Sequence, residues 1–252
     1  MPNKYLQKPP DRNEKNNCLQ ISKTTPLEMN SILSFIQKHK YEFLLFALVQ
    51  HLFIGIFITD LPSYTQVIWP INMIILGLAS IGLFFEKGKL KNRVRNVLLV
   101  MVVLLPVFLP LFGKNEGYMF ALNLIFSGFF IFIFWEILKF LLRPSYINAD
   151  VISASACGYM LLIEINTFLF QLCSYGHPDS FKGLNTADPA STYMDFVYFC
   201  SITITSIGFG DITPNTHHTK LITSLFGIIG QFYTVVLVGI IISKFSSKPA
   251  QS

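Results

Sequence analysis

Apolar residues gather into six long runs that are separated by short polar stretches. The runs cover residues 41–58, 67–85, 94–112, 118–142, 151–174 and 221–245. A helix needs about 20 mostly apolar residues to cross a bilayer, and all six runs reach or approach that length. The pattern therefore predicts an all-α membrane protein with six transmembrane helices.

A seventh apolar stretch, residues 193–207, lies between the fifth and sixth runs and is too short to span a bilayer. Such a segment can enter the membrane and return if it is buried in protein or lines water. We therefore predict a re-entrant segment between the last two spans.

Prolines modify two of the predicted spans. Pro106 and Pro110 fall in the second half of the third run, where they should kink the helix or end it early. Pro70 falls near the start of the second run, a position that tolerates proline.

The charged residues predict how the chain is oriented. Hydrophobic residues make up 52% of the chain and charged residues only 13%, about half the usual share in a soluble domain. The net charge of +5 is concentrated before the first run and after the second, fourth and sixth. Basic loops of this kind mark the cytoplasmic side. We expect a multi-pass protein of the cell membrane with both termini in the cytoplasm, lipids as partners and no nucleic acid.

The fourth run lacks the charges of a voltage sensor. It contains no arginine, and only Glu136 and Lys139 lie near its cytoplasmic end. Moving one charge across the membrane yields about 2.3 kcal/mol per 100 mV, so a steep response needs several regularly spaced charges. We predict no steep voltage gating by a charged helix.

The stretch after the short apolar segment carries the chemistry. Residues 203–211 read Thr-Ile-Thr-Ser-Ile-Gly-Phe-Gly-Asp. A helix that ends inside the membrane directs its negative dipole end toward a cation. Gly208 and Gly210 can adopt backbone angles that bulky residues resist, so successive carbonyls can face one axis. Four such segments would form rings of oxygen that replace the water around an ion, and Ser206 would add a ring of hydroxyls.

The side chains of this stretch should have separate tasks. Ile207 and Phe209 should point away from the axis and pack the segment against its short helix. Asp211 should lie at the outer mouth, where a carboxylate can brace the segment and attract cations.

This stretch resembles the selectivity filter of the potassium channel family, whose usual form is Thr-Val-Gly-Tyr-Gly-Asp. The resemblance covers residues 151–245, in the family order of helix, pore helix, filter and helix. Two residues depart from the usual form, Ser206 replacing threonine and Phe209 replacing tyrosine. Phe209 lacks the hydroxyl that often ties the filter to its pore helix, so the departures concern filter stability and selectivity.

The resemblance implies a set of site residues for K+. The ion-binding filter would consist of Thr205, Ser206, Ile207, Gly208, Phe209 and Gly210. Asp211, Tyr198 and Phe199 would support the filter and its outer mouth. Gly230 falls where family members carry a glycine that acts as a gating hinge in the inner helix. The alternative for Gly230 is close helix packing, as small residues allow in membranes.

One chain holds a single filter, whereas an axial pore needs four, so a homotetramer follows. The expected divisions are a cytoplasmic tail (1–40), a four-helix transmembrane domain (41–145), a pore domain (146–245) and a short cytoplasmic tail (246–252). Glu164 lies within the fifth run. It could brace the pore helix, act as a proton-sensitive switch or be a neutral structural carboxyl.

The function expected from this set is a potassium-selective channel that passes K+ passively. The sequence contains no nucleophile–base pair, metal cluster or phosphate-binding loop, so we expect neither an enzyme, a cofactor nor a small-molecule substrate. Two alternatives stay open. One is a weakly selective monovalent cation channel, and the other is a non-conducting receptor or accessory subunit with a pore-like fold.

Overall fold

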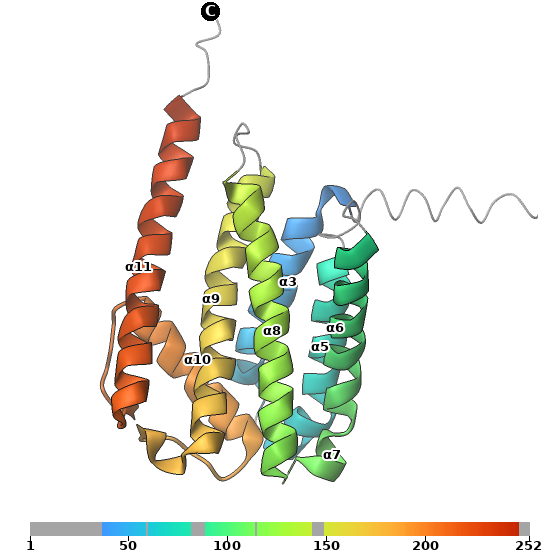
Figure 1. Cartoon of the computed structure of the whole chain (residues 1–252), viewed down its shortest axis with the longest axis vertical. Helices are drawn as coiled ribbons and strands as arrows, with labels where there is room; N and C mark the ends of the chain where they lie inside the picture. The colour runs from blue at the N-terminus through green and yellow to red at the C-terminus, as the bar shows by residue number, and fades with distance from the viewer. Residues whose placement is uncertain (1–36, 59, 82–88, 114, 143–148, 247–252) are drawn as a thin grey trace, which may run out of the picture. The chain divides into compact units, whose positions relative to one another are not determined.

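Helices account for almost all of the residues that the computed structural model describes, which are 37–58, 60–81, 89–113, 115–142 and 149–246 (Figure 1). Seven helices in this part of the chain are longer than ten residues. They are α3 (Lys40–Phe53), α5 (Trp69–Ile81), α6 (Lys89–Val107), α8 (Glu116–Leu141), α9 (Ala149–Gly176), α10 (Pro189–Ile204) and α11 (His217–Ser246). The shorter elements are η1 (Ile54–Phe57), α4 (Leu61–Ser63), η2 (Tyr64–Ile68), α7 (Leu109–Phe112), η4 (Pro178–Ser180), β1 (Phe181–Lys182) and β2 (Thr213–Pro214). The predicted all-α class is confirmed for these residues.

Five helical stretches are long and apolar enough to cross a membrane. They are Lys40–Phe57, Tyr64–Ile81, Glu116–Leu141, Ala149–Gly176 and His217–Leu237. They correspond to the first, second, fourth, fifth and sixth apolar runs. The described residues therefore give five long candidates, one fewer than the six predicted.

The third run forms a shorter apolar helix because of its prolines. Its apolar part is Asn96–Val107, at the end of α6. Pro106 lies inside the last turn of α6. The helix is interrupted at Phe108, and the four-residue helix α7 (Leu109–Phe112) follows. Proline removes a backbone hydrogen bond and its ring clashes with the preceding turn, so the early end predicted for this helix is observed.

The second run begins earlier than the sequence suggested. Its helical stretch starts at Leu61 instead of residue 67 and includes the π-helical turn η2 (Tyr64–Ile68) directly before Pro70. The N–H of Trp69 donates to the carbonyl of Tyr64, five residues back. This wider turn gives room for the proline ring, which would collide with a carbonyl in an ordinary α-helix.

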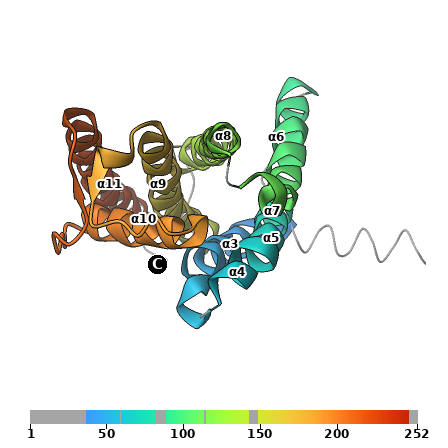
Figure 2. The same ribbon diagram turned by 90° about the horizontal axis from the view of Figure 1, so that it is seen from below.

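Helix α9 lies at the centre of the arrangement. It packs against α3 and α8 on one side and against α10 and α11 on the other (Figures 1 and 2). Helices α5 and α6 extend the layer beyond α3 and α8. Helix α9 therefore joins the first four apolar helices to the elements that carry the filter-like stretch.

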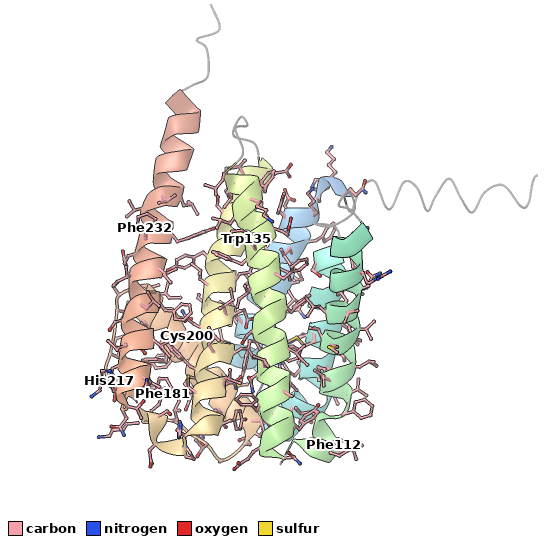
Figure 3. The ribbon with its side chains drawn as sticks, viewed as in Figure 1. Phe112, Trp135, Phe181, Cys200, His217 and Phe232 are labelled. Atoms are coloured by element: carbon pink, nitrogen blue, oxygen red, sulfur yellow. The ribbon has the colours of Figure 1, made fainter. Side chains whose placement is uncertain are left out.

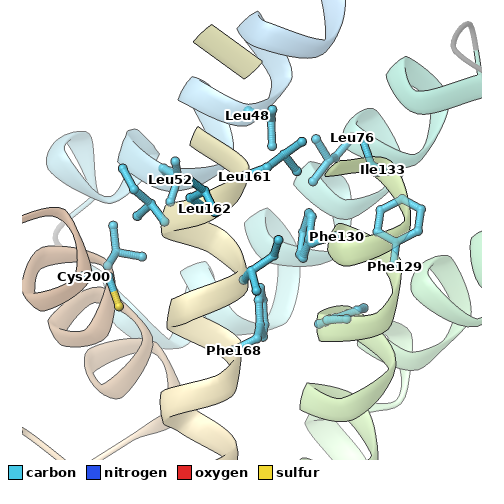
Figure 4. Packing of buried hydrophobic residues seen from close by; sticks show 14 of the residues in the cluster. Leu48, Leu52, Leu76, Phe129, Phe130, Ile133, Leu161, Leu162, Phe168 and Cys200 are labelled. Carbon is cyan, nitrogen blue, oxygen red and sulfur yellow. The ribbon is translucent and has the colours of Figure 1, made fainter. Parts of the chain in front are cut away.

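The contact between α8 and α9 is built from aromatic rings. Phe130 and Phe168 stack at 5.4 Å, and Phe126 meets Phe168 edge to face at 5.2 Å (Figure 4). The three rings are fully buried, and Leu161 and Leu162 of α9 continue the same core toward α3. Helices in a membrane associate through close packing of this kind, since lipid offers no hydrophobic driving force between them.

Candidate functional site

The predicted re-entrant segment is helix α10, which begins at a side-chain cap. The carboxylate of Asp188 accepts hydrogen bonds from the backbone N–H of Ser191 at 2.9 Å and from its hydroxyl at 2.7 Å. Pro189 occupies the first helical turn, where no internal hydrogen bond is lost. The helix ends at Ile204, so its negative dipole end lies against residues 205–210 and favours a cation there.

Phenylalanines hold α10 against α9 and strand β1. The ring of Phe181 in β1 lies 5.0 Å from that of Phe196 and 5.7 Å from that of Phe199. Phe170 of α9 lies 5.2 Å from Phe181 and 5.7 Å from Phe199. Phe199 is therefore buried in an aromatic cluster that holds α10 against α9 and β1.

The backbone of residues 206–210 alternates in handedness. The angle φ is +62° at Ser206, +56° at Gly208 and +83° at Gly210, and it is negative at Ile207 and Phe209. A left-handed residue at every second position turns alternate peptide planes over. Neighbouring carbonyls can then lie on one side of the segment, unlike in a β-strand, where they alternate. This is a backbone suited to surrounding a cation with oxygen.

The start of this segment is fastened to the end of α10. The N–H groups of Ile207 and Gly208 both donate to the carbonyl of Ile202, at 2.8 and 3.2 Å. The N–H of Ser206 donates to the carbonyl of Thr203 at 3.1 Å. The last carbonyls of a helix have no partner within it, and here they fix the turn into residues 206–210.

The segment carries two apolar side chains, those of Ile207 and Phe209. The ring of Phe209 stacks on that of Tyr198 in α10, at 6.5 Å and an interplanar angle of 5°. This agrees with the expectation that Phe209 packs toward the pore helix. Ile207 and Phe209 are nevertheless 57% and 71% exposed in the single chain. Both apolar side chains are therefore largely uncovered in the single chain.

Asp211 at the end of the segment is tied to the same tyrosine. The hydroxyl of Tyr198 donates to Oδ2 of Asp211 at 2.7 Å. This hydrogen bond lowers the pKa of Asp211 below its ordinary value, because the donor stabilises the ionised carboxylate. A hydroxyl on the pore helix thus supplies a tie that Phe209 cannot make.

Gly183, which precedes α10, packs closely against Asp211 at the end of the segment. Gly183 has φ +84°, and a Cβ atom at this residue would lie 2.1 Å from the carbonyl oxygen of Asp211. Strands β1 and β2 pair beside it in antiparallel register. The loop before α10 is therefore in direct contact with the end of residues 206–210. A lone glycine in a loop gives no sequence signal that could have identified this contact.

Gly230 lies where α11 crosses the end of α10. A Cβ atom at Gly230 would lie 2.8 Å from Cγ2 of Ile204, so glycine permits the close approach of the two helices. Helix α11 is continuous through this position. The geometry favours the packing role of Gly230, and its role as a hinge stays a prediction.

Glu164 contacts the pore helix inside the protein. The Tyr193 hydroxyl lies 3.3 and 3.4 Å from the two carboxylate oxygens of Glu164, and Nε2 of His51 lies 3.6 Å from one of them. All three side chains are buried. They come from α9, α10 and α3, so this polar cluster links the first apolar helix to the pore helix.

A family comparison covers the part of the chain that contains this geometry. The sequence profile described as "Ion channel" matches residues 157–247, which include α10, residues 205–211 and α11. Residues 157–247 are therefore similar to an ion channel domain.

Individual relatives of this channel domain are named as potassium channels. The human protein named "Potassium voltage-gated channel subfamily KQT member 3" is 31% identical over 102 residues, which are 40% of this chain and 12% of the relative. "Two pore potassium channel a" of Oryza sativa subsp. japonica is 32% identical over 84 residues, 33% of this chain and 22% of the relative. "Two-pore potassium channel 1" of Arabidopsis thaliana is 36% identical over 73 residues, 29% and 18% of the two chains.

The matches to these relatives cover only a part of each protein. The chain spans less than a quarter of the length of each of these three relatives. No solved structure matches it significantly. The resemblance to the potassium channel family that the sequence shows is confirmed for this part of the chain. The described residues also contain five helices that are long and apolar enough to cross a membrane.

Proposed function

We propose that four copies of this chain form a potassium-selective pore through which K+ moves passively down its gradient. The observation that carries this proposal is the alternating left-handed backbone of residues 206–210, placed at the negative end of α10. Carbonyls turned to one side can replace the hydration shell of K+ in rings around an axis. The proposed ion site is residues 205–210, with Asp211, Tyr198 and Phe199 as its support.

The exposed surface around the filter supports a tetramer. Ile207 and Phe209 are uncovered in one chain, and so are Leu225, Ile228 and Phe232 of α11. Figure 3 labels Phe232 on this helix. One chain supplies one filter segment, and closed fourfold symmetry would bring four segments to one axis. Copies of the chain and membrane lipids would then cover these side chains.

The proposed topology has six spans in the cell membrane with both termini in the cytoplasm. Helices α6 and α7 would together form the kinked third span, because an apolar stretch broken by prolines can still cross when neighbouring helices cover it. The proposed divisions are a tail (1–40), a four-helix domain (41–145), a pore domain (146–245) and a second tail (246–252). The basic loops at the cytoplasmic side support this orientation.

Helix α8 supports gating by something other than a charged sensor. It contains no arginine, and Nζ of Lys139 lies 3.3 Å from the carboxylate of Glu136. Nζ of Lys139 also lies 5.0 Å from the centre of the Trp135 ring. Opposite charges this close move together and transfer little net charge across the field.

Ion flux through the purified full-length protein in liposomes tests the proposal. Under equal gradients, K+ should leave the vesicles much faster than Na+, and cross-linking should trap a species of four chains. Equal rates for the two ions would favour the weakly selective channel. No flux for either ion would favour the non-conducting receptor.

Removing the Tyr198 hydroxyl should make the channel lose conduction at a higher pH. The Asp211 carboxylate has a lowered pKa in the folded protein, so its stabilising effect on the fold is fully present above the ordinary value of 3.8. This stabilising effect is lost as the pH falls through the lowered pKa. Tyr198→Phe keeps the ring that stacks on Phe209 but removes the donor. The midpoint of acid inactivation on the Asp211 side should therefore rise toward 3.8.

The measurement is single-channel current in a planar bilayer as the pH on that side is lowered. His217 and His218 are exposed at the start of α11 and should both be changed to Gln in all variants, so that the compared proteins differ only at Tyr198. If the midpoints with and without the Tyr198 hydroxyl coincide, the bond to Asp211 does not govern the acid response.

A further inference from the structure

One polar side chain of α11 reaches the start of the filter segment. Gln231 directly follows Gly230, the residue that lets α11 approach the end of α10. Nε2 of Gln231 lies 2.6 Å from Oγ of Ser206 and 3.5 Å from the carbonyl oxygen of Ile204. The amide N–H groups donate, and the hydroxyl and carbonyl oxygens accept.

Ser206 is the residue of the filter segment that most needs such a partner. It is the one non-glycine residue with positive φ in the described part of the chain, at +62°. Residues with a side chain rarely adopt this conformation, and it persists where the surroundings hold it. The neighbouring Thr205 hydroxyl is engaged elsewhere, since it donates to the carbonyl of Ser201 at 2.7 Å.

A glutamine in this part of α11 also needs an explanation of its own. Residues 225–237 are otherwise apolar except for Tyr233 and Thr234, and both of these donate to backbone carbonyls. A polar side chain within a spanning helix is costly unless it finds a partner or faces water. The exposed Gln231 finds its partner at the filter.

We propose that Gln231 is a positioning residue that sets the preference of the channel for K+ over Na+ by fixing the Ser206 hydroxyl. This inference rests on the proposed tetrameric pore. A hydroxyl oxygen has two acceptor lone pairs, so one can accept the Gln231 amide while the other faces the ion. Four fixed hydroxyls then form a ring of constant size at the start of the filter. Without the amides, the ring can close around the smaller Na+ and lose its preference.

The test measures the reversal potential of the full-length channel in planar bilayers, with K+ on one side and Na+ on the other. Gln231→Met keeps the length of the side chain but has no donor. It should lower the permeability ratio of K+ to Na+ about tenfold, which corresponds to about 1.4 kcal/mol. Gln231→Asn keeps the amide on a shorter chain that does not reach Ser206, so it should produce the same loss.

Thr234→Val is the matched control. Thr234 lies on the same helix, is also exposed, and its hydroxyl donates only within the helix, to the carbonyl of Gly230 at 3.0 Å. Removing this hydroxyl should leave the permeability ratio unchanged. Size-exclusion chromatography should show that every variant retains the oligomeric state of the unmodified protein.

A double substitution separates positioning from a general effect on the pore. If Gln231 acts through Ser206, Gln231→Met combined with Ser206→Ala should have the same permeability ratio as Ser206→Ala alone. The inference would be overturned if the two substitutions lowered the permeability ratio additively. It would also be overturned if the Gln231→Met channel were as selective as the unmodified protein. An unmodified protein that conducts neither ion would instead overturn the proposed function, whatever the variants do.

Discussion

Aspartate in place of Gly208 should abolish potassium flux while leaving the channel assembled. Gly208 has φ +56°, and nothing in the chain lies within 4 Å of a Cβ atom built there. Aspartate tolerates left-handed backbone better than most residues, so the single chain can fold around it. In the proposed pore, four carboxylates would stand beside the carbonyl rings. Conduction needs ions bound weakly enough to leave, so flux should fall by more than about 100-fold.

Potassium efflux from liposomes measures this loss, and Gly176→Asp serves as its control. Gly176 ends α9, is exposed and likewise has open space around its Cβ position. The same substitution there adds the same charge outside the filter and should leave flux unchanged. Gly208→Ala, which adds no charge, should reduce flux less. Normal flux through the Gly208→Asp protein would remove residues 205–210 from the conduction path.

Replacing Glu164 by leucine should destabilise the protein by about 1–3 kcal/mol, since a buried hydroxyl that loses its acceptor keeps the cost of desolvation. Leucine fills the space of the carboxylate, but it leaves the Tyr193 hydroxyl without its acceptor and removes the polar neighbour of the His51 ring. Because these side chains come from α9, α10 and α3, the loss should loosen the contact between the pore helix and the first apolar helix. The thermal midpoint in detergent should fall.

Two further variants make this prediction specific. Glu164→Gln keeps an acceptor oxygen in nearly the same place and should lose less stability. Asn123 is a buried polar residue whose amide donates only within its own helix, to the carbonyl of Met119. Asn123→Leu should therefore cost little or nothing. If leucine at position 164 costs no more than leucine at position 123, the polar cluster does not hold the helices together.

The sequence predicted features that depend on neighbouring residues. Continuous apolar runs are sufficient to locate long helices, and Pro106 predicted the early end of α6. The two glycines of the filter predicted a left-handed backbone at Gly208 and Gly210, since few other residues adopt it freely. Whether α6 and α7 together cross the membrane as the third span stays a prediction, since their helical path is interrupted at Phe108.

Features that depend on distant residues could not be predicted. The pairs Tyr193–Glu164 and Gln231–Ser206 are 29 and 25 positions apart, and their contacts follow from how α9, α10 and α11 cross. Sequence alone could have indicated Gln231 as a polar residue in an apolar run, but it could not have named Ser206 as its partner. The left-handed backbone at Ser206 had no signal, since serine has no preference for it.

The contact of Gly183 with the Asp211 carbonyl has a consequence for the outer rim. Strand pairing of Phe181 with Pro214 and of Lys182 with Thr213 adds a second attachment between the same two loops. In the proposed pore, the loop before α10 and the end of the filter segment are therefore held together at two places. A molecule that bound this loop from outside the proposed pore and displaced it would therefore also displace Asp211, without entering the ion path.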